Sequence, residues 1–277
     1  MLEGVHKIHL IGIGGSGMRA IANILIQKGY EVSGSDVKES DVIERFRQMG
    51  ATVHIGHNAD YVQGVDAVVR STAIREDNPE IVAAKEQGIT ILHRSDIVKA
   101  VLDVTNGIAV AGAHGKTSTT SMIGQILVEG QMEPTVIIGG EVDYLKGSSC
   151  LGKGEYSVVE ADESDGSFLK LRPKTIVITN IEDDHMDHYK TMENLLNAFC
   201  QFVETLPVDG KAVVCGDNDN IRYVMSKVER QFITYGLEDS NDYVAKNIHY
   251  EDSSLVYDVV RKGETLGRVS LRVPGNH

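Results

Sequence analysis

The stretch Val110-Ala111-Gly112-Ala113-His114-Gly115-Lys116-Thr117-Ser118 decides the fold of this chain. Apolar residues 107–111 lead into its glycine turn. The residues after the turn carry apolar side chains at helical spacing, namely Met122, Ile123, Ile126 and Leu127. A strand, a glycine turn, a Lys-Thr pair and a helix in this order predict a phosphate-binding loop.

The residue types in this loop fit the chemistry of a nucleotide. Backbone N–H groups of a glycine turn and of a helix N-terminus point toward phosphate oxygens, and Lys116 would reach the terminal phosphates. Thr117 would offer its hydroxyl to a magnesium ion. The loop is shorter than the usual pattern, because Val110 stands where a glycine is expected, five residues before Gly115. The alternative is a glycine-rich turn with a surface lysine.

Composition limits the classes of protein to which the chain belongs. Its 277 residues suffice for about two domains, and 42% hydrophobic with 24% charged residues is typical of a globular protein. The net charge of −13, without any cluster of Lys and Arg, argues against nucleic acid as a partner. A polyphosphate bound to so acidic a chain needs local positive groups, since bulk charge is screened beyond ~8 Å at physiological salt.

The cysteines and the N-terminus bear on location. Cys150, Cys200 and Cys215 lie far apart and suggest neither a zinc site nor a disulfide framework. No apolar run is long enough for a membrane span, and residues 1–7 do not resemble a signal peptide. We therefore expect a cytoplasmic protein with no membrane partner.

The N-terminal third has the pattern of a dinucleotide-binding unit. A strand predicted at residues 7–13 opens into Gly12-Ile13-Gly14-Gly15-Ser16-Gly17, and a helix with Met18 facing inward follows. A second predicted strand, residues 31–35, ends at Asp36, where a Rossmann unit carries its ribose-binding acid. One interpretation is a nicotinamide cofactor site. The other is a plain strand–helix turn with Asp36 as a capping or solvent-facing residue.

Strand and helix signals continue to alternate up to residue 103. This alternation predicts an α/β domain with a mostly parallel sheet, whose ligands lie at the carboxyl ends of the strands. Ser71 follows such a strand and either touches a ligand or caps a turn. The short polar segment 103–107 marks a junction, so we assign residues 1–103 to a first domain and residues 104–277 to a second.

Two strand ends after the loop carry carboxylates and a histidine. Glu160 closes a predicted strand at residues 156–160, and His185 lies in an acidic segment, residues 182–188, that follows another strand. A bound Mg²⁺ needs oxygen ligands from a neighbouring strand end, which favours Glu160. The alternatives are helix capping and solvated turns for these acids, or a metal hydrolase built on His185 and His188.

The C-terminal part changes character. Residues 139–154 suggest a mobile, glycine-rich excursion, whereas residues 243–250, 254–261 and 266–273 alternate in period two and predict an antiparallel β meander. Pro274-Gly275-Asn276-His277 is a turn with nothing after it, and we expect the chain to be part of a longer protein. The predicted fold is α/β: a Rossmann-like parallel-sheet domain, then a P-loop ATPase-type α/β domain with an antiparallel β extension.

Five motifs together resemble the Mur ligases. They are Gly12-Ile13-Gly14-Gly15-Ser16-Gly17-Met18, Ser33-Gly34-Ser35-Asp36, Gly112-Ala113-His114-Gly115-Lys116-Thr117, Glu160-Ala161-Asp162-Glu163-Ser164-Asp165, and Thr179-Asn180-Ile181-Glu182 followed by Asp184-His185-Met186-Asp187. The likeness runs from residue 6 to the last residue, and the last three motifs in this order are highly specific. Ala113 departs from the threonine usual in the family, which should weaken contacts of the loop without abolishing them.

The resemblance implies a three-domain, ATP-dependent ligase whose third domain is missing here. His114 and the opening glycine motif are most similar to the family member that joins L-alanine to UDP-N-acetylmuramate through an acyl phosphate, in peptidoglycan precursor synthesis. The first domain would then bind the UDP part of that substrate, not NAD, through Gly14, Gly15, Ser16, Gly17, Met18, Asp36 and Ser71. The central domain would bind ATP through Gly112, Ala113, His114, Gly115, Lys116, Thr117 and Ser118.

By the same resemblance, Lys116 and His185 are catalytic, and Thr117, Glu160 and His185 hold Mg²⁺. We expect a fragment that is inactive alone and that is a monomer or weak homodimer. Two rival hypotheses stay open. A nicotinamide-dependent dehydrogenase leaves Lys116 and Glu160 without a role, and a nucleotide-sensing module would bind its ligand without turnover.

Overall fold

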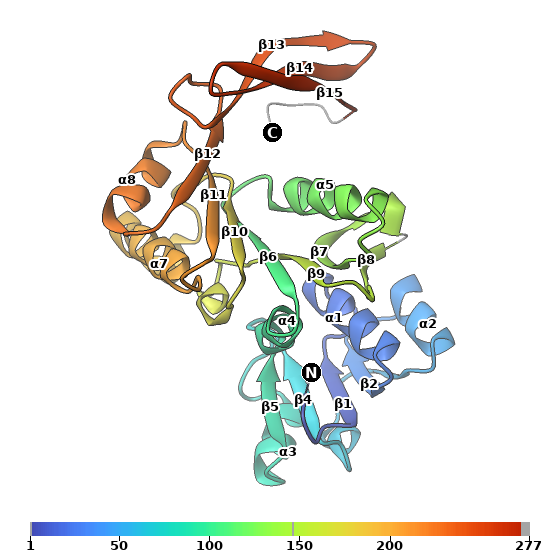
Figure 1. Ribbon diagram of the computed structural model, residues 1–277. Coiled ribbons are helices and arrows are strands. Elements are labelled where there is room, and N and C mark those ends of the chain that lie inside the picture. Colours follow the sequence, from blue (N-terminus) through green and yellow to red (C-terminus); the bar gives the residue numbers. More distant parts are fainter. Residues whose placement is uncertain (1, 146, 273–277) are drawn as a thin grey trace. The chain divides into compact units, whose positions relative to one another are not determined.

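A computed structural model describes residues 2–145 and 147–272 (Figure 1). The chain divides into two compact units. The first unit comprises Met1–Gly107 and Thr120–Glu160, and the second comprises Ile108–Thr119 and Ala161–His277. This division follows contacts in space, so the boundary predicted between residues 103 and 104 stays a prediction.

A five-stranded parallel sheet forms the centre of the first unit. Its order is β3-β2-β1-β4-β5, and every neighbouring pair is parallel. The strands are β1 (Lys7–Ile11), β2 (Glu31–Asp36), β3 (Thr52–Ile55), β4 (Ala67–Arg70) and β5 (Thr90–His93). The strand order reverses at β1, and in open α/β sheets such a switch point is where ligands bind. The Gly12–Gly17 loop leaves β1 at this point.

Helices connect these strands, and their first turns follow ordinary capping chemistry. They are α1 (Ser16–Gln27), α2 (Asp41–Gln48), η1 (Ala59–Val62), α3 (Pro79–Glu86) and α4 (Arg94–Leu102). The Ser40 side chain accepts from the backbone N–H of Ile43 at the start of α2. By contrast, α1 begins after the glycine loop without a side-chain cap, so its first amides are not taken by a capping residue.

The segment 120–160 completes the first unit and bears on two expectations. Much of the excursion predicted at residues 139–154 has regular secondary structure: β7 (Thr135–Val142), η2 (Asp143–Leu145) and β8 (Gly147–Cys150) lie wholly or partly there, and β7 also pairs in parallel with β9 (Tyr156–Glu160). In α5 (Lys116–Glu129), the predicted inward stripe is wrong at Ile126, which is 69% exposed. Gly124 is buried instead, and a side chain there would not fit, since a Cβ would lie 2.5 Å from the Tyr144 hydroxyl.

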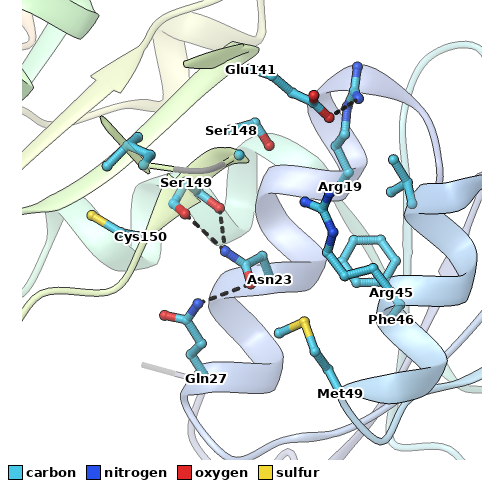
Figure 2. A pocket seen from close by; sticks show the side chains of 13 residues that line it. Arg19, Asn23, Gln27, Arg45, Phe46, Met49, Glu141, Ser148, Ser149 and Cys150 are labelled. Atoms are coloured by element: carbon cyan, nitrogen blue, oxygen red, sulfur yellow. Dashed lines mark hydrogen bonds and ion pairs between the residues drawn. The ribbon is translucent and has the colours of Figure 1, made fainter. Parts of the chain in front are cut away.

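One face of α1 carries polar residues four positions apart that contact the β7–β8 region. Arg19 Nη1 donates to Glu141 Oε1 at 2.9 Å, and Gln27 Oε1 accepts from Leu151 N at 3.1 Å. Between them, Asn23 Nδ2 donates to the carbonyl and the hydroxyl of Ser149 at 2.9 and 3.0 Å (Figure 2). A polar seam therefore holds α1 against β8.

In the described part of the second unit, seven strands follow one another in the order β15-β14-β13-β12-β11-β10-β6. Pairing is parallel from β6 to β13 and antiparallel from β13 to β15, so the predicted β meander and the α/β class are confirmed. The strands are β6 (Asn106–Ala111), β10 (Thr175–Ile178), β11 (Lys211–Cys215), β12 (Phe232–Gly236), β13 (Tyr243–Glu251), β14 (Ser254–Arg261) and β15 (Glu264–Leu271). The predicted turn at residues 274–277 lies outside the described residues.

Helices of the second unit are η3 (Ser167–Lys170), α6 (Met186–Tyr189), α7 (Met192–Glu204) and α8 (Asp219–Lys227). The Thr191 side chain caps α7, and Phe199 and Phe202 from its buried face pack on Phe168 with ring centroids 5.4 and 4.7 Å away. The helix therefore packs its apolar stripe into the core. In the part of the chain that the structure describes, no helix is long and apolar enough to cross a membrane.

Candidate functional site

The glycine loop of the second unit lies between β6 and α5 and is fixed by the segment that follows β10. Gly112 has φ +134°, and a Cβ there would lie 2.2 Å from Thr179 Oγ1 and 2.8 Å from Asn180 O. Asn180 O accepts from Ala113 N at 3.2 Å, and Asn180 Oδ1 accepts from His114 N at 2.9 Å. Only glycine fits at position 112, and the Thr179-Asn180 pair sets the shape of the loop.

Lys116 opens α5 and folds its ammonium over the loop. Its Nζ donates to Gly112 O at 2.5 Å and to Glu163 Oε1 at 2.6 Å. The side chain is only 18% exposed. A positive charge is therefore held where the loop amides would meet phosphate oxygens, as the sequence predicts for a phosphate-binding lysine.

Glu163 is the counter-charge of Lys116, and it is not among the site residues predicted from the sequence. Its side chain is 2% exposed, and its Oε2 has no hydrogen-bond partner among the described residues. Burial raises the pKa of this carboxyl, while the charge of Lys116 acts in the opposite direction. The acidic run 160–165 is visible in the sequence, but no spacing signal separates Glu163 from its neighbours. The one available clue is that a lysine buried in a loop needs a nearby anion.

The imidazole of His185 also lies near the Glu163 carboxylate. Its Nε2 lies 3.5 Å from Glu163 Oε1 and 3.5 Å from Asp184 Oδ2. The backbone of His185 is left-handed, with φ +58°, which is uncommon for a residue other than glycine and is frequent at functional sites. The structure therefore brings the two predicted catalytic residues, Lys116 and His185, together on Glu163.

The residues around Glu163 fit a divalent cation that is shared with phosphate groups. Among the described residues, no group of three or more His, Cys, Asp or Glu forms a metal cage. Mg²⁺ does not need one, because it keeps several waters and takes oxygens from substrate phosphates. The Oε2 of Glu163 is a suitable oxygen ligand at the loop, whereas the imidazole of His185 is a softer group that suits a role in orienting a water or a phosphate. Of the predicted ligands, Thr117 and His185 belong to the second unit and Glu160 to the first.

Glu160 ends β9, where a glycine leaves space for its carboxylate. A Cβ on Gly139 would lie 2.8 Å from Glu160 Oε2. The absence of a side chain at position 139 therefore sets where the Glu160 carboxylate can lie.

The glycine loop of the first unit is hydrogen-bonded to the last residues of β2. Ser35 O accepts from Gly12 N at 2.8 Å and from Ile13 N at 3.1 Å, and Asp36 Oδ2 accepts from Gly14 N at 2.9 Å. Asp36, predicted to bind substrate, therefore holds the loop. Gly15 N donates to Gly12 O at 3.0 Å, and the amides of Ser16 and Gly17 lie at the start of α1, which has no side-chain cap.

Two further residues lie at strand ends of this sheet. Arg94 was not predicted as a site residue, yet its Nη1 lies 3.3 Å from the position of a Cβ on Gly17, so a guanidinium covers the end of the loop. Ser71 follows β4 and accepts from Ile74 N through its backbone carbonyl at 3.1 Å, in a turn. A separate cavity of about 270 Å³ lies between α1, α2 and β8 (Figure 2), and none of the predicted site residues lines it.

Comparisons with known proteins cover nearly the whole chain. Residues 7–104 match the family described as Mur ligase family, catalytic domain, and residues 110–277 match the Mur ligase middle domain. A protein of Desulfatibacillum aliphaticivorans named UDP-N-acetylmuramate–L-alanine ligase is 43% identical over 272 residues, which are 98% of this chain and 60% of that protein. One of the same name from Dictyoglomus turgidum is 46% identical over 98% of this chain and 58% of its own length. The chain thus spans about 60% of these curated relatives.

Solved structures agree. The UDP-N-acetylmuramate:L-alanyl-gamma-D-glutamyl-meso-diaminopimelate ligase of Neisseria meningitides superimposes with a TM-score of 0.89 at 26% identity, over 98% of this chain and 89% of that chain. The UDP-N-acetylmuramate-alanine ligase of Thermotoga maritima gives a TM-score of 0.86 at 29% identity, over 97% of this chain and 61% of that chain. The predicted family resemblance is confirmed.

Proposed function

Because the chain belongs to the Mur ligase family, we propose that it is the nucleotide-binding part of an ATP-dependent ligase that joins L-alanine to UDP-N-acetylmuramate. The observation that carries this proposal is the convergence of Lys116 and His185 on the buried Glu163 beside a glycine loop. The names of relatives 43% and 46% identical support the choice of substrates. The matched ranges also support a domain boundary near residues 103 and 104.

The proposed reaction has two steps. A carboxylate oxygen of UDP-N-acetylmuramate attacks the γ-phosphorus of ATP, and the bond to the β-phosphate oxygen breaks, which gives an acyl phosphate and ADP. The amine of L-alanine then attacks the acyl carbon, the amine loses a proton, and inorganic phosphate leaves as the amide forms. Lys116 stabilises the negative charge that spreads over the transferred phosphoryl group, and the loop amides hold its oxygens.

Magnesium is part of the proposal, with Thr117, Glu160 and His185 as its residues and Glu163 as a further donor. When bound, Mg²⁺ would neutralise charge on the phosphates of ATP. Glu163 has a role of its own: its carboxylate holds Lys116 over the loop through the 2.6 Å contact. ATP as a substrate and three free cysteines support a cytoplasmic location. The proposed reaction belongs to peptidoglycan precursor synthesis.

The first unit would bind the uridine diphosphate part of the substrate. Ser35 and Asp36 accept from the amides of residues 12–14, and Gly12 O accepts from Gly15 N, so the amides of Ser16 and Gly17 at the start of α1 are the ones proposed to meet phosphate oxygens. Arg94, beside Gly17, would add a cation that this acidic chain needs for an anionic ligand. Met18 and Ser71 complete the set of proposed substrate residues.

A thermal-shift experiment separates the proposal from a nicotinamide-dependent dehydrogenase. We expect UDP to raise the melting temperature of the chain, and to raise it further with the logarithm of the UDP concentration above Kd, since a ligand at 100 times its Kd stabilises the folded state by about 2.7 kcal/mol. NAD⁺ and NADH at equal concentration should leave the melting temperature unchanged. Stabilisation by NADH without stabilisation by UDP would refute the proposal.

A further inference from the structure

A buried polar cluster in the first unit has no part in the proposed reaction. Its centre is Glu80, the second residue of α3, which is 0% exposed. Glu80 Oε2 accepts from Ser35 Oγ at 2.7 Å and from His9 Nε2 at 3.0 Å. Glu80 Oε1 accepts from His57 Nδ1 at 3.0 Å and from Asn58 N at 3.3 Å. Four donors from three parts of the chain therefore meet on one carboxylate.

The charge of Glu80 is matched to these donors. Burial by itself raises the pKa of Glu80, but the hydrogen bonds from His9 and Ser35 outweigh burial and hold the pKa below its ordinary value. The carboxylate is therefore ionised at neutral pH. An ionised carboxylate only accepts hydrogen bonds, so it fixes the direction of the hydroxyl of Ser35 and of the proton on His57 Nδ1.

Ser35 connects this cluster to the glycine loop. Its side chain binds Glu80, while its carbonyl accepts from Gly12 N at 2.8 Å and from Ile13 N at 3.1 Å. The next residue, Asp36, accepts from Gly14 N at 2.9 Å. Three successive loop amides thus end on the Ser35-Asp36 pair.

His9, on the β1 side of the cluster, is hydrogen-bonded to both Glu80 and Ser33. His9, in β1, is 0% exposed, and its Nδ1 lies 2.9 Å from Ser33 Oγ in β2. Glu80 thus contacts both strands that flank the start of the loop, through His9 in β1 and Ser35 in β2. His57 Nδ1, which donates to Glu80, also lies 3.2 Å from the Ser35 hydroxyl.

We infer that Glu80 is a positioning residue for the glycine loop of the first unit. It fixes Ser35, and Ser35 together with Asp36 fixes the amides of residues 12–14, so that the amides of Ser16 and Gly17 are presented to the ligand. Glu80 itself does not touch the ligand. The identity of that ligand, a uridine diphosphate, rests on the proposed function, whereas the effect on the loop does not.

Amide hydrogen exchange of residues 12–14 tests the inference without any ligand. In Glu80→Gln we expect exchange on the order of tenfold faster at these amides, because the amide side chain offers one acceptor oxygen where the carboxylate offers two. Ser35→Ala, which keeps the backbone carbonyl, should show a smaller increase in the same direction. If Glu80→Gln does not fold, Ser35→Ala still decides the matter.

Thr105→Val is the matched control. Thr105 Oγ1 donates to Val101 O at 2.9 Å and lies 2.6 Å from Ser157 Oγ, so the variant also loses internal hydrogen bonds of the first unit, without any contact to the loop. Its amides 12–14 should exchange as in the unsubstituted chain. Unchanged exchange in folded Glu80→Gln and Ser35→Ala, or equal acceleration in Thr105→Val, would overturn the inference.

Calorimetric titration with UDP and ADP gives the second measurement. Glu80→Gln should raise the Kd for UDP about tenfold and leave the Kd for ADP unchanged, while Thr105→Val should change neither. Equal UDP affinity in Glu80→Gln and the unsubstituted chain would overturn the inference. If the unsubstituted chain does not bind UDP while Glu80→Gln still loses protection at residues 12–14, the proposed function fails and the positioning role of Glu80 stands.

Discussion

Lys116 and Glu163 form a buried ion pair at the loop, and removing one partner leaves the charge of the other buried and unpaired. In Lys116→Met the carboxylate of Glu163, 2% exposed, loses its counter-charge. Breaking a buried pair costs about 3 kcal/mol of unfolding free energy. We expect Lys116→Met to lose stability of this order at neutral pH, as measured by urea unfolding.

The loss should depend on pH with a defined sign. The pKa of Glu163 is already raised above 4.5 by burial, and without the charge of Lys116 it rises further. A carboxyl with a higher pKa in the folded than in the unfolded chain lowers stability as pH rises from about 4.5 through the folded-state pKa. Lys116→Met should therefore lose less stability at pH 5 than at pH 8. Lys85→Met, which breaks an exposed pair with Glu76, should show no such difference. An equal loss at both pH values would contradict this account.

At the scale of single residues, the sequence predicted which residue types the site needs better than it predicted which residues are in contact there. The lysine and the histidine of the site follow from motifs, because phosphate chemistry demands a cation at a fixed place after a glycine turn. Glu163 and Arg94 were missed because their roles depend on which strand ends meet in space. The Asp36 carboxylate accepts from Gly14 N, a contact that only the folded loop reveals, while its role in binding substrate stays a prediction.

At the scale of elements, the polar seam of α1 makes a testable contribution. Asn23 Nδ2 donates to both the carbonyl and the hydroxyl of Ser149, which is 3% exposed (Figure 2). Asn23→Ala would leave these groups without their donor, at a cost of about 1–2 kcal/mol. The midpoint of urea unfolding should fall accordingly. Gln48→Ala on α2 is the control, because the Gln48 side chain donates to Glu44 at an exposed position. Its unfolding midpoint should not move, and a fall similar to that of Asn23→Ala would argue against a specific contribution of the seam.

The same seam explains why some elements were predicted and others were not. Period-two alternation identified the meander and the 3.6 period identified α7, because each buries an apolar face. Residues 139–154 lack that signal, since β8 is held largely by polar contacts such as Asn23 to Ser149. In α5 the packing face is defined by Gly124, and a pattern of large apolar residues therefore pointed to Ile126 instead.

At the scale of the whole molecule, the two units each carry one glycine loop and so predict two separate ligand footprints. The α/β class and the order of the domains follow from the alternation of strands and helices. The assignment of segment 120–160 to the first unit does not, because it depends on contacts between α1 and the β7–β8 region that are distant in the chain.

Hydrogen exchange with each nucleotide in turn measures these footprints. UDP should slow exchange at residues 12–17, and ADP should slow it at residues 112–118, because a bound ligand stabilises only the segments whose opening releases it. Lys116→Ala should lose the ADP footprint and keep the UDP footprint, since Lys116 belongs to the second unit. Loss of both footprints in this variant would contradict the proposed division of labour between the two loops. An ADP footprint at residues 12–17 would assign the first loop to a different nucleotide.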